Sequence, residues 1–332
     1  MTESFPTTEH GLVLARDLRI AGREAELYAA VKAGRLERVR RGAYRRTGAD
    51  DGDLGRAELA ALRYRAMVHA AAEALGRPVF TGHSAVALAG LPIVGAWPTH
   101  VTVMSRDRLG SRRPGVVTVA RPADVPTVQM EGCATTTIEF ALIQLARHAP
   151  LAAALVATDA ALRVPREPEG SGPVTTLDAL RAEHERLQPY PGSRRVDAVL
   201  ARATAHADSP LETMSRLVIE EVGFPEPILQ HRVWLSELGR SADLDFYWPD
   251  HGVAAEADGR GKYLSEGGAS ATAQDVIKEK EREDAIRRRV LGFARWNWKE
   301  MWAKEPVRAY LATAGLPVTR KRVRLIALAP PK

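Results

Sequence analysis

The sequence predicts an α/β protein of several domains, and three observations support this prediction. The chain has 332 residues, of which 45% are hydrophobic, so it can bury more than one core. Two short helical patterns and a basic hairpin occupy the N-terminal end, and strand-like segments carrying carboxylates lie near the C-terminal end. We expect a helix-turn-helix domain at 1–50, a middle α/β scaffold at 54–200, a mixed sheet flanked by helices at 208–315 and a basic tail at 316–332.

Composition excludes several classes of protein. The single cysteine, Cys133, allows neither an intrachain disulfide nor a cysteine-rich zinc site, and we expect it to be a small packing residue. No segment approaches the ~18 apolar residues of a membrane span. The first residues lack the basic and apolar regions of a signal peptide. We therefore expect a cytoplasmic protein with no membrane partner.

The N-terminal domain has the element order of a winged helix-turn-helix. Residues 11–20 and 23–33 carry apolar side chains at helical spacing, and Gly34 is placed to end the second helix. A hairpin with its turn at 40–42 follows. In such a fold the second helix enters the major groove of double-stranded DNA and the hairpin lies near phosphates.

Basic charge is concentrated in this domain. Residues 1–48 contain ten Lys/Arg and six Asp/Glu, and so carry +4 of the chain's net charge of +6. The candidate DNA-binding residues are Arg35, Arg38, Arg40, Arg41, Arg45 and Arg46. A small helical cap with a solvated basic hairpin would have the same pattern.

The segment 21–46 resembles the N-terminal domain of AbiEi-type antitoxins. The matching positions of the hairpin are Gly34, Arg35, Leu36, Arg38, Val39, Arg41, Gly42 and Tyr44. This resemblance implies binding to promoter or operator DNA, and a toxin as a protein partner.

The middle region has the composition of a scaffold. Helical patterns at 54–75 and 135–163 and apolar strands between them indicate a packing domain that is also a candidate for homodimer formation. His83 and Ser84 are adjacent and would point to different faces of a helix, which argues against a base and a nucleophile. Ser84-Ala85, the segment 90–92, Asp159 and Leu162 resemble the middle region of the same family.

The C-terminal domain places carboxylates on neighbouring strands. A helix begins after Ser209, which is suited to cap it, and Glu212 sits at its third position. The strand at 242–248 carries Asp245, and the strand after the turn at 249–252 carries Glu256 and Asp258. Converging carboxylates would bind a hard divalent cation such as Mg²⁺. Solvent-facing carboxylates, and a simple turn at Asp258, are the alternative.

Residues 208–302 resemble the PD-(D/E)XK nuclease superfamily, and more narrowly its very-short-patch-repair-like endonucleases. The matching segments are 209–212, 245–249, 256–259, 262–263, 279–284 and 296–298. The resemblance implies that Asp245 and Glu256 bind Mg²⁺ or Mn²⁺ and that Glu212 assists. Asp258 occupies the place of a lysine in many of these nucleases, and Lys262 or Lys280 would supply the missing cation.

The charged run 278–289 is typical of a solvated helix with pairs such as Glu283 with Arg287, or of a DNA-facing helix. The leading functional hypothesis is a DNA-binding protein with a metal-dependent endonuclease domain. The first alternative is a non-catalytic antitoxin-type repressor that binds operator DNA or a toxin. The second is an interaction module that neutralises a toxin without binding DNA.

Overall fold

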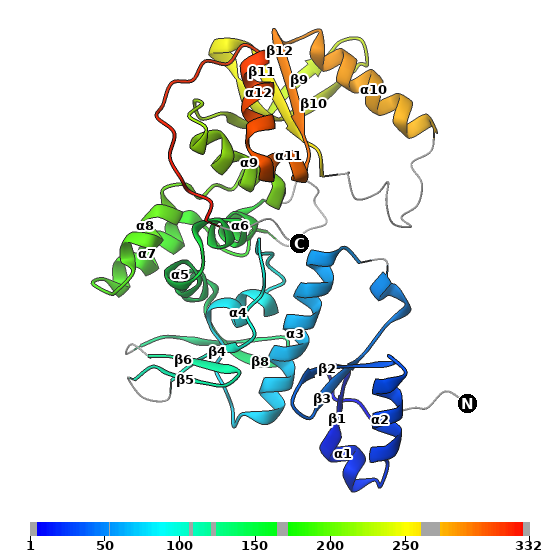
Figure 1. The fold of residues 1–332 in the computed structure, drawn as a ribbon. Helices are drawn as coiled ribbons and strands as arrows, with labels where there is room; N and C mark the ends of the chain where they lie inside the picture. Colours follow the sequence, from blue (N-terminus) through cyan, green and yellow to red (C-terminus); the bar gives the residue numbers. More distant parts are fainter. Residues whose placement is uncertain are drawn as a thin grey trace. The chain divides into compact units, whose positions relative to one another are not determined.

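The structure is a computed structural model that describes residues 5–52, 54–105, 109–120, 124–164, 172–259 and 273–327. The chain divides into two compact units, one formed by 1–92 with 96–145 and the other by 93–95 with 146–332 (Figure 1). Residues 54–200, expected to form one middle domain, are therefore divided between the units. No helix among the described residues is long and apolar enough to cross a membrane.

The first unit begins with a small three-stranded sheet and two helices. Their order along the chain is β1 (Leu12–Leu14), α1 (Ala15–Ile20), α2 (Glu24–Lys32), β2 (Leu36–Arg40) and β3 (Ala43–Arg46). The antiparallel sheet has the order β1-β3-β2, and a core that includes Leu18, Leu27 and Leu36 holds the helices against it. The prediction of helix for 12–14 is wrong, because these three residues are all buried and pair with β3, which a helix with one apolar face cannot do.

The rest of this unit is a long helix beside two small sheets. The elements are η1 (Ala49–Gly52), α3 (Arg56–Ala74), α4 (Gly82–Leu88), β4 (Val101–Met104), β5 (Ser111–Arg113), β6 (Val116–Val119), β7 (Thr127–Met130) and β8 (Cys133–Thr136). The sheets have the orders β4-β6-β5 and β7-β8. Phe80 bridges to both and is fully buried, so one core holds them together.

Helix α5 (Ile138–His148) leads into the second unit, whose centre is a four-stranded mixed sheet. Its strands are β9 (Ile228–Leu235), β10 (Arg240–Trp248), β11 (Val253–Ala257) and β12 (Gly292–Trp296), in the order β12-β11-β10-β9. Only β11 and β12 are parallel. The helices are α6 (Leu151–Leu162), α7 (Leu177–Leu187), α8 (Ser193–Leu200), α9 (Pro210–Glu221), α10 (Ala273–Arg287), α11 (Trp298–Ala303) and α12 (Glu305–Thr313), with a short turn η2 (Pro249–His251).

Buried side chains on both sides of the sheet attach these helices. Trp296 of β12 donates its indole N–H to Ser215 of α9 at 2.8 Å, and it is 1% exposed. Ala285 and Ile286 of α10 pack with Leu244 in a second cluster. The described sheet is therefore covered by α9, which precedes it in the sequence, and by α10, which lies between β11 and β12.

The basic tail has no helix or strand within 316–327, yet it is held to the end of α9. The backbone N–H groups of Thr319 and Arg320 donate to the carbonyl of Gly223 at 3.0 Å. The N–H of Ile326 donates to the Glu221 carboxylate at 2.8 Å. These contacts make the described part of the tail a strap on the second unit.

Candidate functional site

The hairpin of β2 and β3 presents only some of its arginines to solvent. Arg35, Arg38, Arg41 and Arg46 are exposed. Arg40 is half-buried, and burial lowers the pKa of its guanidinium; its Nη1 lies 3.5 Å from the carbonyl of Gly115. Of the six arginines expected to bind DNA, Arg40 and Arg45 are therefore not fully exposed in the described structure.

Arg45 faces the interior of the first unit and not a DNA phosphate. It is 6% exposed, and its guanidinium is ion-paired with Glu37 at 2.6 Å and Asp51 at 2.7 Å. Asp51 belongs to η1, so this pair ties the hairpin to the segment that follows it. Alternation along a short strand gives every second residue to the core, and Arg45 occupies such an inward position, between the half-buried Tyr44 and the exposed Arg46.

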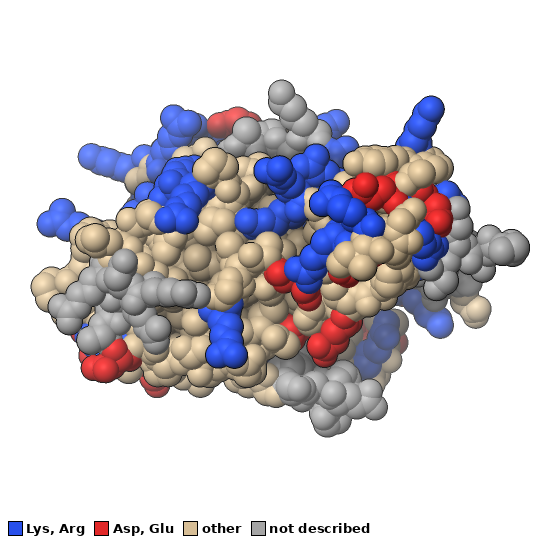
Figure 2. Space-filling view, turned by 90° about the horizontal axis from the view of Figure 1, so that it is seen from below, with Lys and Arg blue, Asp and Glu red and all other residues tan. Residues whose placement is uncertain are grey.

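Helix α2 presents an aromatic ring and a lysine to solvent. Tyr28 is 64% exposed, and Lys32 in the last turn is exposed as well. The acidic residues of the helix are paired within the domain, Glu24 with Arg19 at 2.8 Å and Glu26 with Arg23 at 2.7 Å. Seen from the end where α1 and α2 lie, Lys and Arg cover more of the surface than Asp and Glu (Figure 2). This charge balance suits a polyanion.

Carboxylates of the second unit form the other candidate site. Asp245 is on β10 and Glu256 is on β11. The antiparallel register of these strands pairs Phe246 with Ala255, so its continuation by one residue places the two carboxylates opposite each other. Glu212 reaches the same region from the first turn of α9 and is 5% exposed.

Gln230 of β9 links Glu212 to Asp245. Its side-chain amide donates to Glu212 at 2.7 Å and to Asp245 at 3.3 Å. Asp245 also accepts a hydrogen bond from the backbone N–H of Ala257 at 2.9 Å. Glu212 also accepts a hydrogen bond from Ser209 Oγ at 2.8 Å. The same side chain therefore contacts the residue that caps α9 and belongs to the carboxylate cluster.

The buried carboxylates have raised pKa values. Burial is the main cause that raises the pKa of Asp245 to about 7, and the negative charge of Glu212 adds to it, while the Ala257 N–H acts in the opposite direction. Burial also raises the pKa of Glu212. Buried carboxyls with raised pKa values are typical of functional sites, and structural networks also produce them.

Glu256 is engaged by two arginines. Arg282 of α10 lies 2.8 Å from its Oε1, and Arg295 of β12 donates to its Oε2. Arg295 also pairs with Glu279 at 3.1 Å and Glu283 at 2.9 Å. Neither arginine was predicted from the sequence as a site residue, because the β11–β12 register that pairs Glu256 with Arg295 is set by the tertiary structure. Glu256 thus has its charge neutralised by protein groups.

These residues do not fit a magnesium site of three carboxylates in the arrangement described. Among the described residues, the oxygens of Glu212, Asp245 and Glu256 are not a set that lies within 4.8 Å of one another. Both oxygens of the Glu256 carboxylate are also engaged by guanidinium groups, one by Arg282 and the other by Arg295. Of the three carboxylates, Glu212 and Asp245 share a hydrogen-bond donor, the side-chain amide of Gln230.

The other predicted residues lie as follows. Asp258 is half-buried at the end of β11, where its backbone N–H donates to the carbonyl of Trp296 at 2.8 Å. Lys280 is exposed on α10. Lys262 lies outside the described residues. The pair expected between Glu283 and Arg287 is confirmed at 2.7 Å.

A known protein family matches the N-terminal end of the chain. Residues 8–47 match the family described as "Transcriptional regulator, AbiEi antitoxin". The match covers β1, α1, α2 and the β2–β3 hairpin. No curated protein matches the chain. The N-terminal part of the resemblance is therefore supported, and the nuclease-like part has no support from these comparisons.

Proposed function

We propose that the protein is a DNA-binding transcriptional regulator of the AbiEi antitoxin kind. The observation that carries this proposal is the family match at 8–47, which coincides with the segment whose helix and hairpin expose basic side chains. This function is the non-catalytic antitoxin-type repressor, the first alternative that the sequence predicts.

The geometry supports a winged-helix mode of binding. In this mode α2 enters the major groove, where Tyr28 and Lys32 are the exposed side chains that meet base edges and phosphates. The hairpin then contacts the backbone through Arg38 and Arg41. Arg45 has no part in it, because it is buried and paired.

The test is a binding titration of the full chain with a duplex from the promoter of its own gene, at several salt concentrations. Phosphate contacts make the logarithm of affinity fall linearly with the logarithm of salt concentration, with a slope of about 0.9 per contact. We expect Arg38→Ala with Arg41→Ala to weaken binding and to reduce this slope by about two contacts. The control is Arg181→Ala, a 54% exposed arginine side chain on α7, which should bind as the unmodified protein does. Equal binding and equal slopes in all three proteins would refute the proposal.

A toxin is the second partner that this kind of protein implies. We propose that binding of such a partner accompanies DNA binding, as in a toxin–antitoxin pair. Co-purification of the protein with the product of a neighbouring gene tests it, and failure of the two to associate at micromolar concentration would contradict it.

A second candidate function is phosphodiester hydrolysis with Mg²⁺ or Mn²⁺, and the shared contact of Glu212 and Asp245 with Gln230 favours it. Cleavage requires Glu256 to exchange its arginine partners for the ion, and for this reason we rank it second. Supercoiled DNA with Mg²⁺, Mn²⁺ or EDTA tests it. Asp245→Asn should abolish cleavage, and Asp243→Asn, on the same strand, should not. Absence of metal-dependent cleavage by the unmodified protein removes this candidate.

A further inference from the structure

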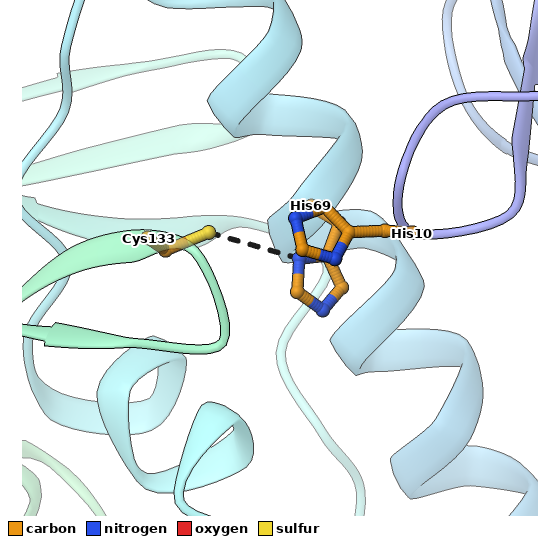
Figure 3. A group of neighbouring side chains, drawn as sticks. All are labelled: His10, His69 and Cys133. Atoms are coloured by element: carbon orange, nitrogen blue, oxygen red, sulfur yellow. Dashed lines mark hydrogen bonds between the residues drawn. The ribbon is translucent and has the colours of Figure 1, made fainter.

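Two histidines and the single cysteine of the chain lie together in the first unit. His10 precedes β1, His69 is on α3 and Cys133 begins β8. One potential ligand atom from each side chain lies within 4.8 Å of the other two, and among the described residues no other set of three His, Cys, Asp or Glu side chains meets this condition. The three side chains lie side by side (Figure 3). His69 is 6% exposed, Cys133 is 3% exposed and His10 is half-buried.

The ring of His69 has different partners on its two nitrogens. Its Nδ1 lies 3.7 Å from the sulfur of Cys133, and its Nε2 lies 3.2 Å from the carboxylate of Glu131. A carboxylate at Nε2 favours the proton on that nitrogen, which leaves the lone pair on Nδ1 directed toward the sulfur. Histidines that bind metals usually have this arrangement, in which the second nitrogen donates to a carboxylate.

His10 completes the group from a separate segment. Its ring stacks on that of His69, with centroids 3.8 Å apart and an angle of 19° between the planes. It also lies against the turn between β7 and β8, because a Cβ on Gly132 would come within 3.3 Å of the His10 ring. Gly132 has φ +70°, which any other residue would adopt with strain. The turn therefore leaves room for the imidazole.

We propose that His10, His69 and Cys133 bind a zinc ion. Imidazole and thiolate are ligands that zinc prefers, and magnesium does not. The 3.7 Å between His69 Nδ1 and the Cys133 sulfur agrees with the separation of about 3.6 Å between such ligands in a tetrahedral zinc site. Three protein ligands leave a fourth position for water or another oxygen donor.

The site joins three segments that are remote in the sequence. His10 lies in the segment matched to the regulator family, whereas α3 and β8 lie outside it. An ion held by all three would fix the start of β1 to α3 and β8 within the first unit. Zinc would then regulate how firmly the helix and hairpin are held for DNA, a consequence that rests on the proposed DNA-binding function.

The test uses the tag-free, metal-stripped full chain titrated with Co²⁺ as a spectroscopic substitute for zinc. We expect one equivalent of Co²⁺ to produce a sulfur-to-cobalt charge-transfer band that Zn²⁺ then abolishes. Cys133→Ser should lose the band, and His10→Ala, at a half-buried position before β1, should weaken Zn²⁺ binding at least tenfold. His206→Gln, an exposed histidine of the second unit, is the control and should bind as before. Circular dichroism verifies that each variant is folded.

Absence of the charge-transfer band in the unmodified protein, or equal Zn²⁺ affinity in the unmodified, Cys133→Ser and His10→Ala proteins, would overturn the proposed site. DNA titrations with saturating Zn²⁺ and with EDTA separate the two proposals. Metal binding without any DNA binding would refute the regulator function and leave the zinc site in place. DNA affinity that does not change with Zn²⁺ would refute the regulatory coupling alone.

Discussion

Arg282 lies 2.8 Å from the carboxylate of Glu256, and this contact joins α10 to β11. Arg295 binds the other oxygen of the same carboxylate, and the Glu256 side chain is only 7% exposed. Breaking a buried ion pair by removing one partner is strongly destabilising, because the other charge is left buried. The two arginines engage both oxygens of Glu256 and connect β11 to α10 and to β12.

Removal of one guanidinium should destabilise the second unit strongly. We expect Arg295→Ala to lower the free energy of unfolding by more than about 2 kcal/mol, because the buried Glu256 carboxylate keeps Arg282 alone of its two guanidinium partners and Glu283 loses its contact with Arg295. The control is Arg232→Ala, whose side chain is 72% exposed beside Asp243 and whose loss should cost less than about 1 kcal/mol. Urea denaturation measures both, and similar losses in the two variants would contradict the assignment.

Replacement of Arg45 should lower the stability of the protein, whereas replacement of Arg41 should weaken DNA binding. Arg45→Ala removes the shared partner of Glu37 and Asp51, so we expect a loss of about 3 kcal/mol in unfolding free energy. Arg41→Ala should leave stability within about 0.5 kcal/mol and weaken DNA binding, since Arg41 is exposed. Thermal unfolding and DNA titration of the two variants provide the measurement. A stable Arg45→Ala protein with weakened DNA binding would instead support the sequence-based prediction that Arg45 binds DNA.

Gly223 should not tolerate a side chain. It has φ +91°, and an added Cβ would lie 2.4 Å from the carbonyl oxygen of Arg320, a backbone atom of the strap. We expect Gly223→Ala to cost more than about 2 kcal/mol and to increase protease cleavage within 317–327. Gly239→Ala also has positive φ but meets no atom within 4 Å, and it should cost only about 1 kcal/mol. Equal costs would show that the strap does not pack against Gly223.

Asp159 should make stability depend on pH. Burial is the main cause that raises its pKa from 3.8 to about 6, against the opposing effect of Arg216. Because the folded-state value is the higher one, the protonated form stabilises the fold, fully below about pH 4, and this stabilisation is lost as pH rises through about 6. The loss is about 3 kcal/mol.

The variant Asp159→Asn should remove this contribution from the pH dependence of the unfolding free energy, which denaturation between pH 4 and 8 measures. Asp178→Asn, at a carboxylate whose side chain is 97% exposed, serves as the control. If the unmodified protein and Asp159→Asn have parallel pH profiles, the raised pKa is wrong.

Much of the local structure was predictable from the sequence, because it depends on neighbours along the chain. Ser209 accepts a hydrogen bond from the N–H of Glu212, as expected of a helix cap. The turn at 249–252 and the hairpin turn before Ala43 lie where glycine and proline indicated them. The strands β5 and β7 were not predicted, because β5 has exposed polar residues and β7 is short and mostly exposed. The helix expected at 135–163 is wrong at Thr135 and Thr136, which belong to β8 and pair with β7.

The sequence by itself determined local features, such as the helix that begins after Ser209, and the basic character of the N-terminal domain. Only the tertiary structure decided that Arg45 is buried, that Glu256 is neutralised by Arg282 and Arg295, and that His10, His69 and Cys133 meet. The physical reason is that local propensity and alternation act over a few residues. Burial and charge pairing depend on which distant segments the fold brings into contact, and no spacing in the sequence records that.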